Sequence, residues 1–241
     1  MVAEKHKLLA CSWTTVAQRY DQELVPRFKP YTQRLLSLFL QRPLPTGPVY
    51  VPACGPGHEL VLLGEALPGR QLFGVDLAAG MVELADQKLA QAGLRLRSEL
   101  AVGDACSVPG ACRPAAGMFS CFSLQQMPQP AAVLAAWAAA LAPGGVLAVA
   151  YWPPAAAPPD ARWRALTDPA TLAKAVAAAP ASCAHAHVLV DEAPAFDMHF
   201  DSAAAFFGVD TCRTAASAAP QALGQQHMAE LRRLRDQYTL M

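Results

Sequence analysis

Glycines and an acid are grouped between Pro48 and Asp76, where the residue types suit binding of a nucleotide-like molecule. The apolar run Val49–Val51 leads into the turn Ala53–Gly57, and a helical segment follows. Glycine lets a backbone approach a ligand closely, and the free N–H groups of a helix N-terminus favour a negatively charged group. Asp76 ends the next apolar run, where a carboxylate can accept hydrogen bonds from both ribose hydroxyls. The stretch therefore predicts a site for a nucleotide-containing cofactor.

Two common nucleotide-binding motifs are absent from this stretch. The dinucleotide motif GxGxxG needs a third glycine, but Leu60 stands three residues after Gly57. A P-loop ends in Gly-Lys-Ser or Gly-Lys-Thr, and the stretch contains no lysine. What remains is a short glycine turn with acids at the ends of the second and third predicted strands, Asp76 and Asp104. These features suit a molecule with an amino-acid tail, a ribose and an adenine.

Apolar runs of strand length alternate with helical segments along most of the chain. We predict strands near 49–53, 71–76, 96–102, 117–123 and 146–152, and helices at 58–67, 79–92 and 130–142. Two last strands are expected at His187–Asp191 and Phe196–Asp201. This alternation predicts an α/β fold, a Rossmann-like, doubly wound, seven-stranded, mostly parallel sheet with helices on both faces. Ligands then bind at the carboxyl ends of the strands.

Residues 1–48 precede the first strand and are predicted to be mostly helical. Trp13, Val16 and Tyr20 fall on one face of a first helix, and a second helix is expected at 31–40. Pro26 and Pro30 are predicted to separate the two helices. We expect residues 49–241 to form the binding domain and the whole chain to fold as a single compact domain.

Charge and cysteine usage exclude several classes of partner. The 19 basic and 19 acidic residues give a formal net charge of +0, so we expect a small-molecule substrate and no nucleic acid. A basic run around Arg232 is interpreted as a solvated helix face, with nucleic-acid contact as the minority interpretation. The seven cysteines show neither a CxxC nor a Cys/His ligand spacing, so we expect reduced thiols, no metal and a cytoplasmic location. Pro143-Gly144-Gly145 interrupts the apolar stretch 131–152, so no membrane span is expected.

Five segments, in this order, resemble motifs of the class I S-adenosylmethionine-dependent methyltransferases. They are Val49–Gly57, Gly74–Met81, Val102–Ala105, Phe122–Pro128 and Leu141–Leu147. The resemblance points in particular to the small-molecule branch that includes the ubiquinone/menaquinone-type methyltransferases. The segment Trp13–Asp21 is similar to the lid helix ahead of that family's core, which implies a helical lid at residues 1–48. The implied function is methyl transfer from S-adenosylmethionine to a small, apolar or aromatic metabolite, with S-adenosylhomocysteine as product.

The resemblance also implies which residues bind the cofactor. The glycine turn would admit the methionine portion, Asp76 would bind the ribose, and Asp104 with Ala105 would bind the adenine. Leu77, Met81 and Cys121 would line the adenine and sulfonium region. The full implied set is Ala53, Cys54, Gly55, Gly57, Asp76, Leu77, Met81, Gly103, Asp104, Ala105 and Cys121.

Two positions in the turn segment depart from the family's pattern. Val51 stands where the family places an acid that orients the glycine turn, and Ala53 stands in place of the first glycine. The alternative function is therefore a catalytically silent, methyltransferase-like binding or regulatory protein. The catalytic residue is not identified, and His58, His199 and Tyr20 are candidates. Histidine suits proton removal from an acceptor hydroxyl or acidic carbon, although a lone histidine is as often a helix-cap or surface residue.

Overall fold

The computed structural model describes residues 2–151, with side chains from His6 onward. This part of the chain forms a five-stranded parallel sheet in the order β3-β2-β1-β4-β5. The strands are β1 (Val49–Pro52), β2 (Leu72–Asp76), β3 (Ser98–Val102), β4 (Ala115–Cys121) and β5 (Leu141–Ala150). The parallel Rossmann-like sheet is thus confirmed. The last two predicted strands and His199 lie outside the described residues.

The strand order reverses direction between β1 and β4. From β1 the chain first builds outward through β2 to β3, and then returns to place β4 on the other side of β1. Open α/β sheets bind ligands in the crevice at such a switch point, outside the carboxyl ends of the strands. We therefore expect a ligand site next to the segments that follow β1 and β4.

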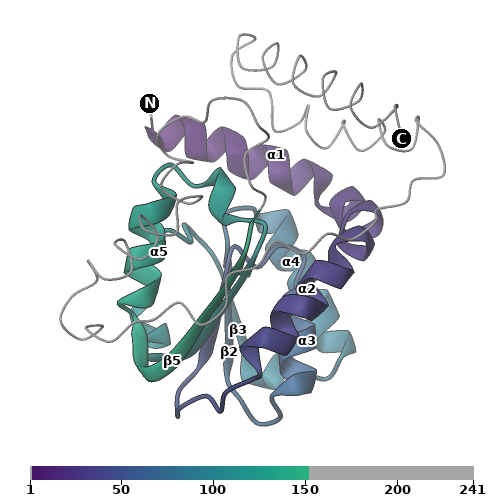
Figure 1. Ribbon diagram of the computed structural model, residues 1–241. Coiled ribbons are helices and arrows are strands. Elements are labelled where there is room, and N and C mark those ends of the chain that lie inside the picture. Colours follow the sequence, from purple (N-terminus) through teal and green to yellow (C-terminus); the bar gives the residue numbers. More distant parts are fainter. Residues whose placement is uncertain (1, 152–241) are drawn as a thin grey trace, which may run out of the picture.

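Helices cover both faces of the sheet (Figure 1). α2 (Val25–Phe39), α3 (His58–Ala66) and α4 (Ala79–Gln91) lie on one face, and α5 (Pro130–Ala138) lies on the other. α1 (Val2–Glu23) runs across the top of the sheet in Figure 1 and packs against α4. Its Thr14 lies so close to Gly80 that a Cβ atom on Gly80 would lie 2.9 Å from the Thr14 carbonyl oxygen.

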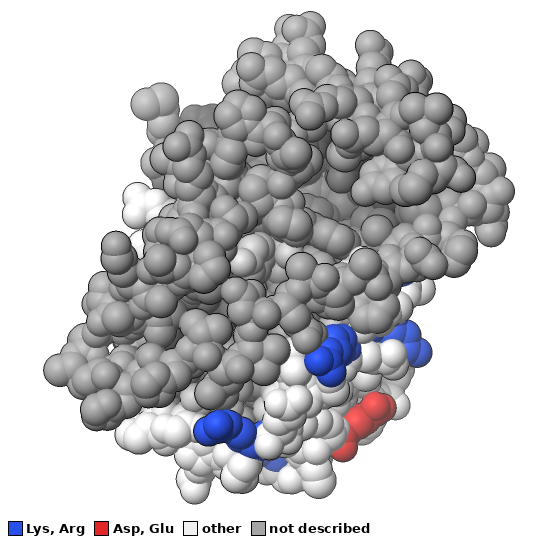
Figure 2. Space-filling model, in the orientation of Figure 1, with Lys and Arg blue, Asp and Glu red and all other residues white. Residues whose placement is uncertain are grey.

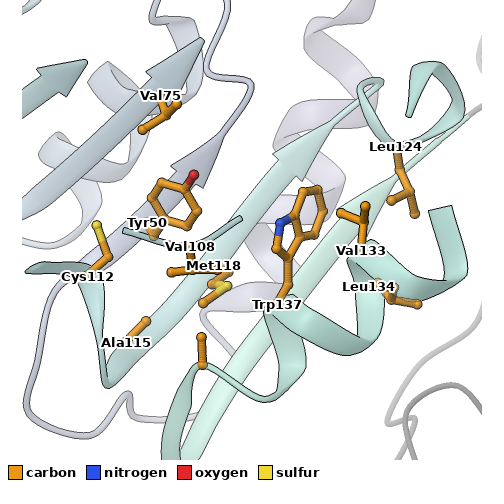
Figure 3. Packing of buried hydrophobic residues seen from close by; sticks show 11 residues of the cluster. Tyr50, Val75, Val108, Cys112, Ala115, Met118, Leu124, Val133, Leu134 and Trp137 are labelled. Atoms are coloured by element: carbon orange, nitrogen blue, oxygen red, sulfur yellow. The ribbon is translucent and has the colours of Figure 1, made fainter. Parts of the chain in front are cut away.

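Strand β1 shows how the two faces of the core are built. Val49 and Val51 point toward a cluster that includes Phe39 of α2, whereas Tyr50 points toward Trp137 of α5. Figure 3 shows Tyr50 and Trp137 in the layer between the sheet and α5. All three β1 residues are at most 1% exposed. A strand buried on both faces reads as a continuous apolar run, which is why this segment is so hydrophobic.

The predicted boundary between the N-terminal helices is wrong. α1 ends at Glu23 and α2 begins at Val25, so that both Pro26 and Pro30 lie inside α2. Pro26 lies in the first turn, where a backbone N–H has no helical partner in any case. Pro30 removes one further hydrogen bond, which the packing of α2 against β5 and α3 offsets.

The start of β5 also differs from the prediction. The strand begins at Leu141 rather than near residue 146, and α5 correspondingly ends at Ala138. The Pro143-Gly144-Gly145 segment lies within β5 and produces a register shift against Ala115–Gly117 of β4. A Cβ atom on Gly145 would lie 2.9 Å from the Ala142 carbonyl oxygen, so glycine is required for this local bend.

The visible surface of the described part carries charges of both signs. In Figure 2, Lys and Arg side chains and an acidic side chain lie among uncharged residues below the grey segment. Within residues 2–151, none of the helices combines the length and hydrophobicity needed to span a membrane. The cytoplasmic location stays a prediction.

Candidate functional site

The turn after β1 contains three residues with positive φ, at Ala53 (+50°), Gly55 (+52°) and Gly57 (+83°). A Cβ atom added to Gly55 would meet no heavy atom within 4 Å, so this glycine faces open space. A Cβ atom on Gly57 would lie 2.7 Å from the Cα atom of Ala85, so this glycine is required for packing of the turn against α4. The two glycines of the turn therefore have different roles in the fold.

Asp76 holds the glycine turn in place. Its Oδ2 atom accepts a hydrogen bond from Gly55 N at 2.9 Å, and its Oδ1 atom accepts one from Ala78 N at 2.9 Å. Val51, at the position of the family's orienting acid, is buried in the apolar core. Asp76 thus orients the turn from the neighbouring strand. Burial raises the pKa of Asp76, while hydrogen bonds from Ala78, Gly55 and Leu77 oppose that increase.

The Asp76 carboxylate is still able to bind a ribose. Each carboxylate oxygen has two acceptor positions, and the hydrogen bonds from Gly55, Ala78 and Leu77 leave part of this capacity unused. The remaining capacity can accept a hydrogen bond from a ribose hydroxyl. Together with the open space at Gly55, this capacity means that the residues present fit an adenosine-containing cofactor.

A cavity lies at the switch point between β1 and β4, beneath the two N-terminal helices. It is lined by residues from α1 and α2, from the glycine turn and α3, and from the end of β4. They are Tyr20, Val25, Phe28, Ala53, Cys54, Gly55, Pro56, Glu59, Cys121 and Phe122. Four of the predicted cofactor residues are therefore brought together here, namely Ala53, Cys54, Gly55 and Cys121.

Aromatic rings connect the N-terminal helices to the end of β4. Phe28 of α2 lies 4.8 Å from Phe122 between ring centroids, and Tyr31 lies 5.8 Å from Phe122. Tyr20 of α1 contacts Phe28 at 6.2 Å and Trp13 at 5.5 Å. Phe122 adopts φ +55°, an unfavourable conformation for a residue with a large side chain. Strained residues of this kind are concentrated at ligand-binding sites.

Glu59 is a cavity residue that the sequence analysis missed. It lies in the first turn of α3 and is partly buried. Burial raises the pKa of Glu59 to about 7, while Lys88 and the Thr32 hydroxyl oppose the increase. An acid in the first turn of a helix is ordinarily read as a partner of the helix dipole, so its position in the sequence gave no sign of a binding role.

The ends of β2 and β3 form the more open side of the site. Gly103 N donates to the Asp76 carbonyl oxygen at 2.8 Å, which joins the two strand ends. Asp104 is exposed, and its Oδ1 atom accepts from Cys106 N at 2.8 Å. Burial would raise the pKa of Asp104, but hydrogen bonds from Cys106 outweigh that effect and lower it. The Ala105 carbonyl accepts the indole N–H of Trp137 at 2.9 Å.

Leu77 and Met81 are among the predicted cofactor residues that lie outside the cavity lining. Met81 is 3% exposed and packs against Ala17 of α1 and Ala78. Leu77 is half-buried directly after Asp76. Their predicted contacts with the adenine and sulfonium region stay predictions.

The candidate catalytic residues are placed differently. Tyr20 lines the cavity, whereas His58 is half-buried at the start of α3 and outside the cavity lining. Burial, followed by the positive charges of Lys88 and Lys29, lowers the pKa of His58. Its Nε2 atom is buried without a hydrogen-bond partner among the described residues. Burial thus favours the neutral form of the His58 imidazole.

The cavity thiols are protonated rather than nucleophilic. Burial raises the pKa of Cys54 and of Cys121 well above the ordinary value, and the negative charge of Glu59 adds to the increase for both. Within residues 6–151, no three His, Cys, Asp or Glu side chains gather in a way that would hold a metal ion. The site thus offers carboxylates, aromatic rings and backbone amides as its binding groups.

Comparison with known proteins agrees with this geometry. Residues 49–145 match the family model described as a methyltransferase domain. This match covers less than half of the chain, and it makes residues 49–145 similar to methyltransferases. The methyltransferase match begins with β1 and ends inside β5, so it includes the glycine turn, Asp76 and Asp104. The ubiquinone-type branch stays a prediction.

Individual methyltransferases resemble the chain over part of its length. The trans-aconitate 2-methyltransferase of Sinorhizobium fredii is 36% identical over 106 residues, which cover 44% of this chain and 38% of the relative. The chain thus matches well under half the length of that curated relative. Two solved methyltransferases in complex with S-adenosyl-L-homocysteine are also similar. The protein from Thiobacillus denitrificans is 20% identical, with a TM-score of 0.46 and coverage of 56% of this chain and 53% of that chain. The protein from Geobacter sulfurreducens is 21% identical, with a TM-score of 0.42 and coverage of 48% and 47%.

Proposed function

We propose that the chain binds S-adenosylmethionine at the carboxyl ends of its strands and transfers a methyl group to a small, apolar or aromatic metabolite. The observation that carries this proposal is the juxtaposition of open space at Gly55 with the cavity at the β1–β4 switch point. The match of residues 49–145 to a methyltransferase domain supports the choice of cofactor.

In this proposal the residues of the site divide the binding of the cofactor among them. Bound S-adenosylmethionine supplies a methyl group already activated on a positively charged sulfur. Gly55 leaves room for the methionine portion, Asp76 accepts the ribose hydroxyls, and Asp104 accepts the adenine amino group. Ala105 offers a backbone N–H to the adenine ring.

The N-terminal helices act as the proposed lid over the acceptor substrate. Tyr20 and Phe28 enclose the cavity from above, and Phe122 encloses it from the end of β4. Methyl transfer needs alignment and exclusion of water more than it needs strong acid–base groups. Tyr20 is the described candidate that can contact the substrate directly. An aromatic enclosure favours an apolar or aromatic acceptor over a highly charged one.

A catalytically silent binding protein is the second candidate function. The specific observation in its favour is that Ala53 occupies the left-handed region where the family has glycine. Ala53 leaves less room than glycine at the entry to the turn. Asp76 favours the first candidate function, because it orients the turn in place of the missing acid.

Calorimetry followed by a turnover assay tests the proposal. We expect the full-length chain to bind S-adenosylmethionine and S-adenosylhomocysteine at micromolar concentrations. Labelled cofactor is then incubated with a quinone, a phenol, a thiol and a carboxylate, with trans-aconitate as the carboxylate. Incorporation of label into the quinone or phenol supports the proposed substrate class, and incorporation into trans-aconitate shows that the substrate class is wrong. Binding without incorporation into any acceptor favours the silent protein, and no binding at millimolar cofactor refutes both.

A further inference from the structure

The cavity at the switch point has the chemistry of a site for an organic cation. Its described lining contains one carboxylate, Glu59, and the aromatic rings of Tyr20, Phe28 and Phe122. No lysine or arginine belongs to this lining. Aromatic faces attract cations within about 6 Å, and the attraction grows when water is excluded. A buried carboxylate without a strong cationic partner gains most from a ligand that brings a positive charge.

The groups around Glu59 compensate its negative charge only in part. Lys88 of α4 faces it, but the Lys88 ammonium is bound to the Asp21 carboxylate of α1. The backbone N–H of Glu59 and the Thr32 hydroxyl of α2 also favour the ionised form, whereas the Asp21 carboxylate opposes it. The thiols of Cys54 and Cys121 lie in the same cavity. Glu59 is therefore half protonated near pH 7, since burial raises its pKa to about 7.

The sulfur of S-adenosylmethionine is the cationic atom that best matches this position. It joins the methionine portion to the ribose, and in the proposed function those portions belong to the glycine turn and to Asp76. Glu59 shares one cavity with the turn residues Ala53–Pro56 and with the aromatic rings on the acceptor side. The reacting sulfur has to lie between these two walls. The cofactor's carboxylate, by contrast, would be repelled by Glu59.

We infer that Glu59, together with the aromatic rings around it, recognises the positive sulfonium of S-adenosylmethionine and so distinguishes it from the neutral thioether of S-adenosylhomocysteine. This inference rests on the proposed function. It assigns Glu59 as a specificity residue that favours the methyl donor over the product. Cofactor binding would fix Glu59 in its ionised form and release its proton.

Calorimetry with the full-length chain tests the inference through Glu59→Gln, which keeps the shape of the side chain and removes its charge. At pH 8 we expect the substitution to weaken binding of S-adenosylmethionine about tenfold and binding of S-adenosylhomocysteine less than threefold. Glu65→Gln is the matched control, because Glu65 is an exposed acid on the same helix, α3. The control is expected to bind both molecules as the native chain does. Circular dichroism verifies that both variants are folded.

Proton release gives a second readout that does not depend on activity. At pH 6.5 a carboxyl with a pKa of about 7 is about three-quarters protonated, so S-adenosylmethionine binding should release a substantial fraction of a proton. Titrations in two buffers with different ionisation enthalpies measure that fraction. Glu59→Gln should abolish the release, and S-adenosylhomocysteine should show little of it. The cofactor's amino group titrates near pH 8 and is common to both molecules, so the comparison cancels it.

The outcomes separate this inference from the proposed function. Equal loss of affinity for both molecules in Glu59→Gln, or no loss for either, overturns the sulfonium assignment while the proposed function stands. Failure of the native chain to bind either molecule overturns the proposed function and the assignment together. A selective loss for S-adenosylmethionine with loss of proton release supports the assignment.

Discussion

The two ends of the candidate site contain the same kinds of residue in opposite environments. The turn end comprises residues 53–59 beneath α1 and α2, and the strand end comprises Asp76 and residues 103–106 after β2 and β3. Glu59 at the turn end is partly buried in a cavity that also contains aromatic rings, and burial raises its pKa to about 7. Asp104 at the strand end is exposed and hydrogen-bonded, and its pKa falls. Two carboxyl groups along one edge of the sheet therefore have pKa values shifted in opposite directions.

The glycines show the same contrast within a few residues. Gly55 faces open space, Gly57 is pressed against α4, and a Cβ atom on Gly103 would make an ordinary 3.5 Å contact with Val75. A motif glycine is therefore no uniform sign of ligand contact. At the turn end one glycine serves ligand access and another serves helix packing, and substitutions separate the two roles.

The largest effect is expected from Gly57→Ala. The new Cβ atom would lie within 2.8 Å of two atoms of Ala85, and φ is +83°. Overpacking and the left-handed conformation together should lower the free energy of unfolding by about 3 kcal/mol. Gly103→Ala at the strand end is the control and should change it by less than about 0.5 kcal/mol. Urea unfolding measures both, and equal effects would show that the turn end is no more tightly packed than the strand end.

The next effect concerns Asp76→Ala compared with Asp104→Ala. Asp76 loses acceptors for Gly55 N and Ala78 N as well as the proposed ribose contact. We expect S-adenosylhomocysteine binding to weaken at least about tenfold, because charged hydrogen bonds contribute about 1.5–3 kcal/mol. Asp104→Ala should weaken it less than about threefold, since exposed groups contribute less. Calorimetry on folded variants measures both constants, and an unchanged constant for Asp76→Ala would contradict the ribose assignment.

A smaller effect is expected in the pH dependence of stability. The pKa of Glu59 is higher in the folded chain, about 7, than its ordinary value of 4.5. Between these two pH values Glu59 is protonated in the folded chain and ionised in the unfolded chain. The stability that Glu59 contributes at low pH is therefore lost as the pH rises through 7. Without ligand, Glu59→Gln should match the native chain at pH 4.5 and exceed it by about 1 kcal/mol at pH 8, after allowance for partial exposure.

Asp104→Asn is expected to change the stability at pH 8 in the opposite direction to Glu59→Gln. The pKa of Asp104 is lowered in the folded chain, so its stabilising contribution is present above the ordinary value of 3.8 and lost as the pH falls through the folded value. The Asn variant should therefore be slightly less stable than the native chain at pH 8. Thermal unfolding at pH 4.5 and pH 8 measures both variants. If both variants were more stable, or both less stable, than the native chain at pH 8, the two carboxylates would not differ in environment as described.

The smallest effect is expected from Ala53→Gly. Ala53 adopts φ +50°, a backbone conformation that favours glycine. We expect the substitution to relieve more backbone strain than it costs through the greater conformational entropy of glycine in the unfolded chain. We expect a gain of about 0.5 kcal/mol in the free energy of unfolding and equal or tighter cofactor binding. Urea unfolding and calorimetry measure the two quantities. A loss of stability would show that the turn is not strained at this position.

The parallel α/β sheet and the position of its binding edge can be predicted from the amino-acid sequence. Continuous apolar runs such as Val49–Val51, spaced by helical segments, are local patterns that encode buried parallel strands. The glycine turn and the acid Asp76 at a strand end are equally local, because each depends on residues next to each other in the chain. The helix boundary near Pro26 was misplaced, since tertiary packing tolerates proline inside α2.

Tertiary structure alone decided the roles of the individual side chains. Asp76 bonds to a turn 21 residues away, and Gly57 packs against Ala85, so neither role can be read from a local pattern. Glu59 becomes a cavity carboxylate because the fold brings it into one cavity with Tyr20, Phe28 and Phe122, which come from three separate segments. The burial that raises its pKa is a property of that enclosure. Distances and burial between residues far apart in the chain exist only once the helices and the sheet have packed together.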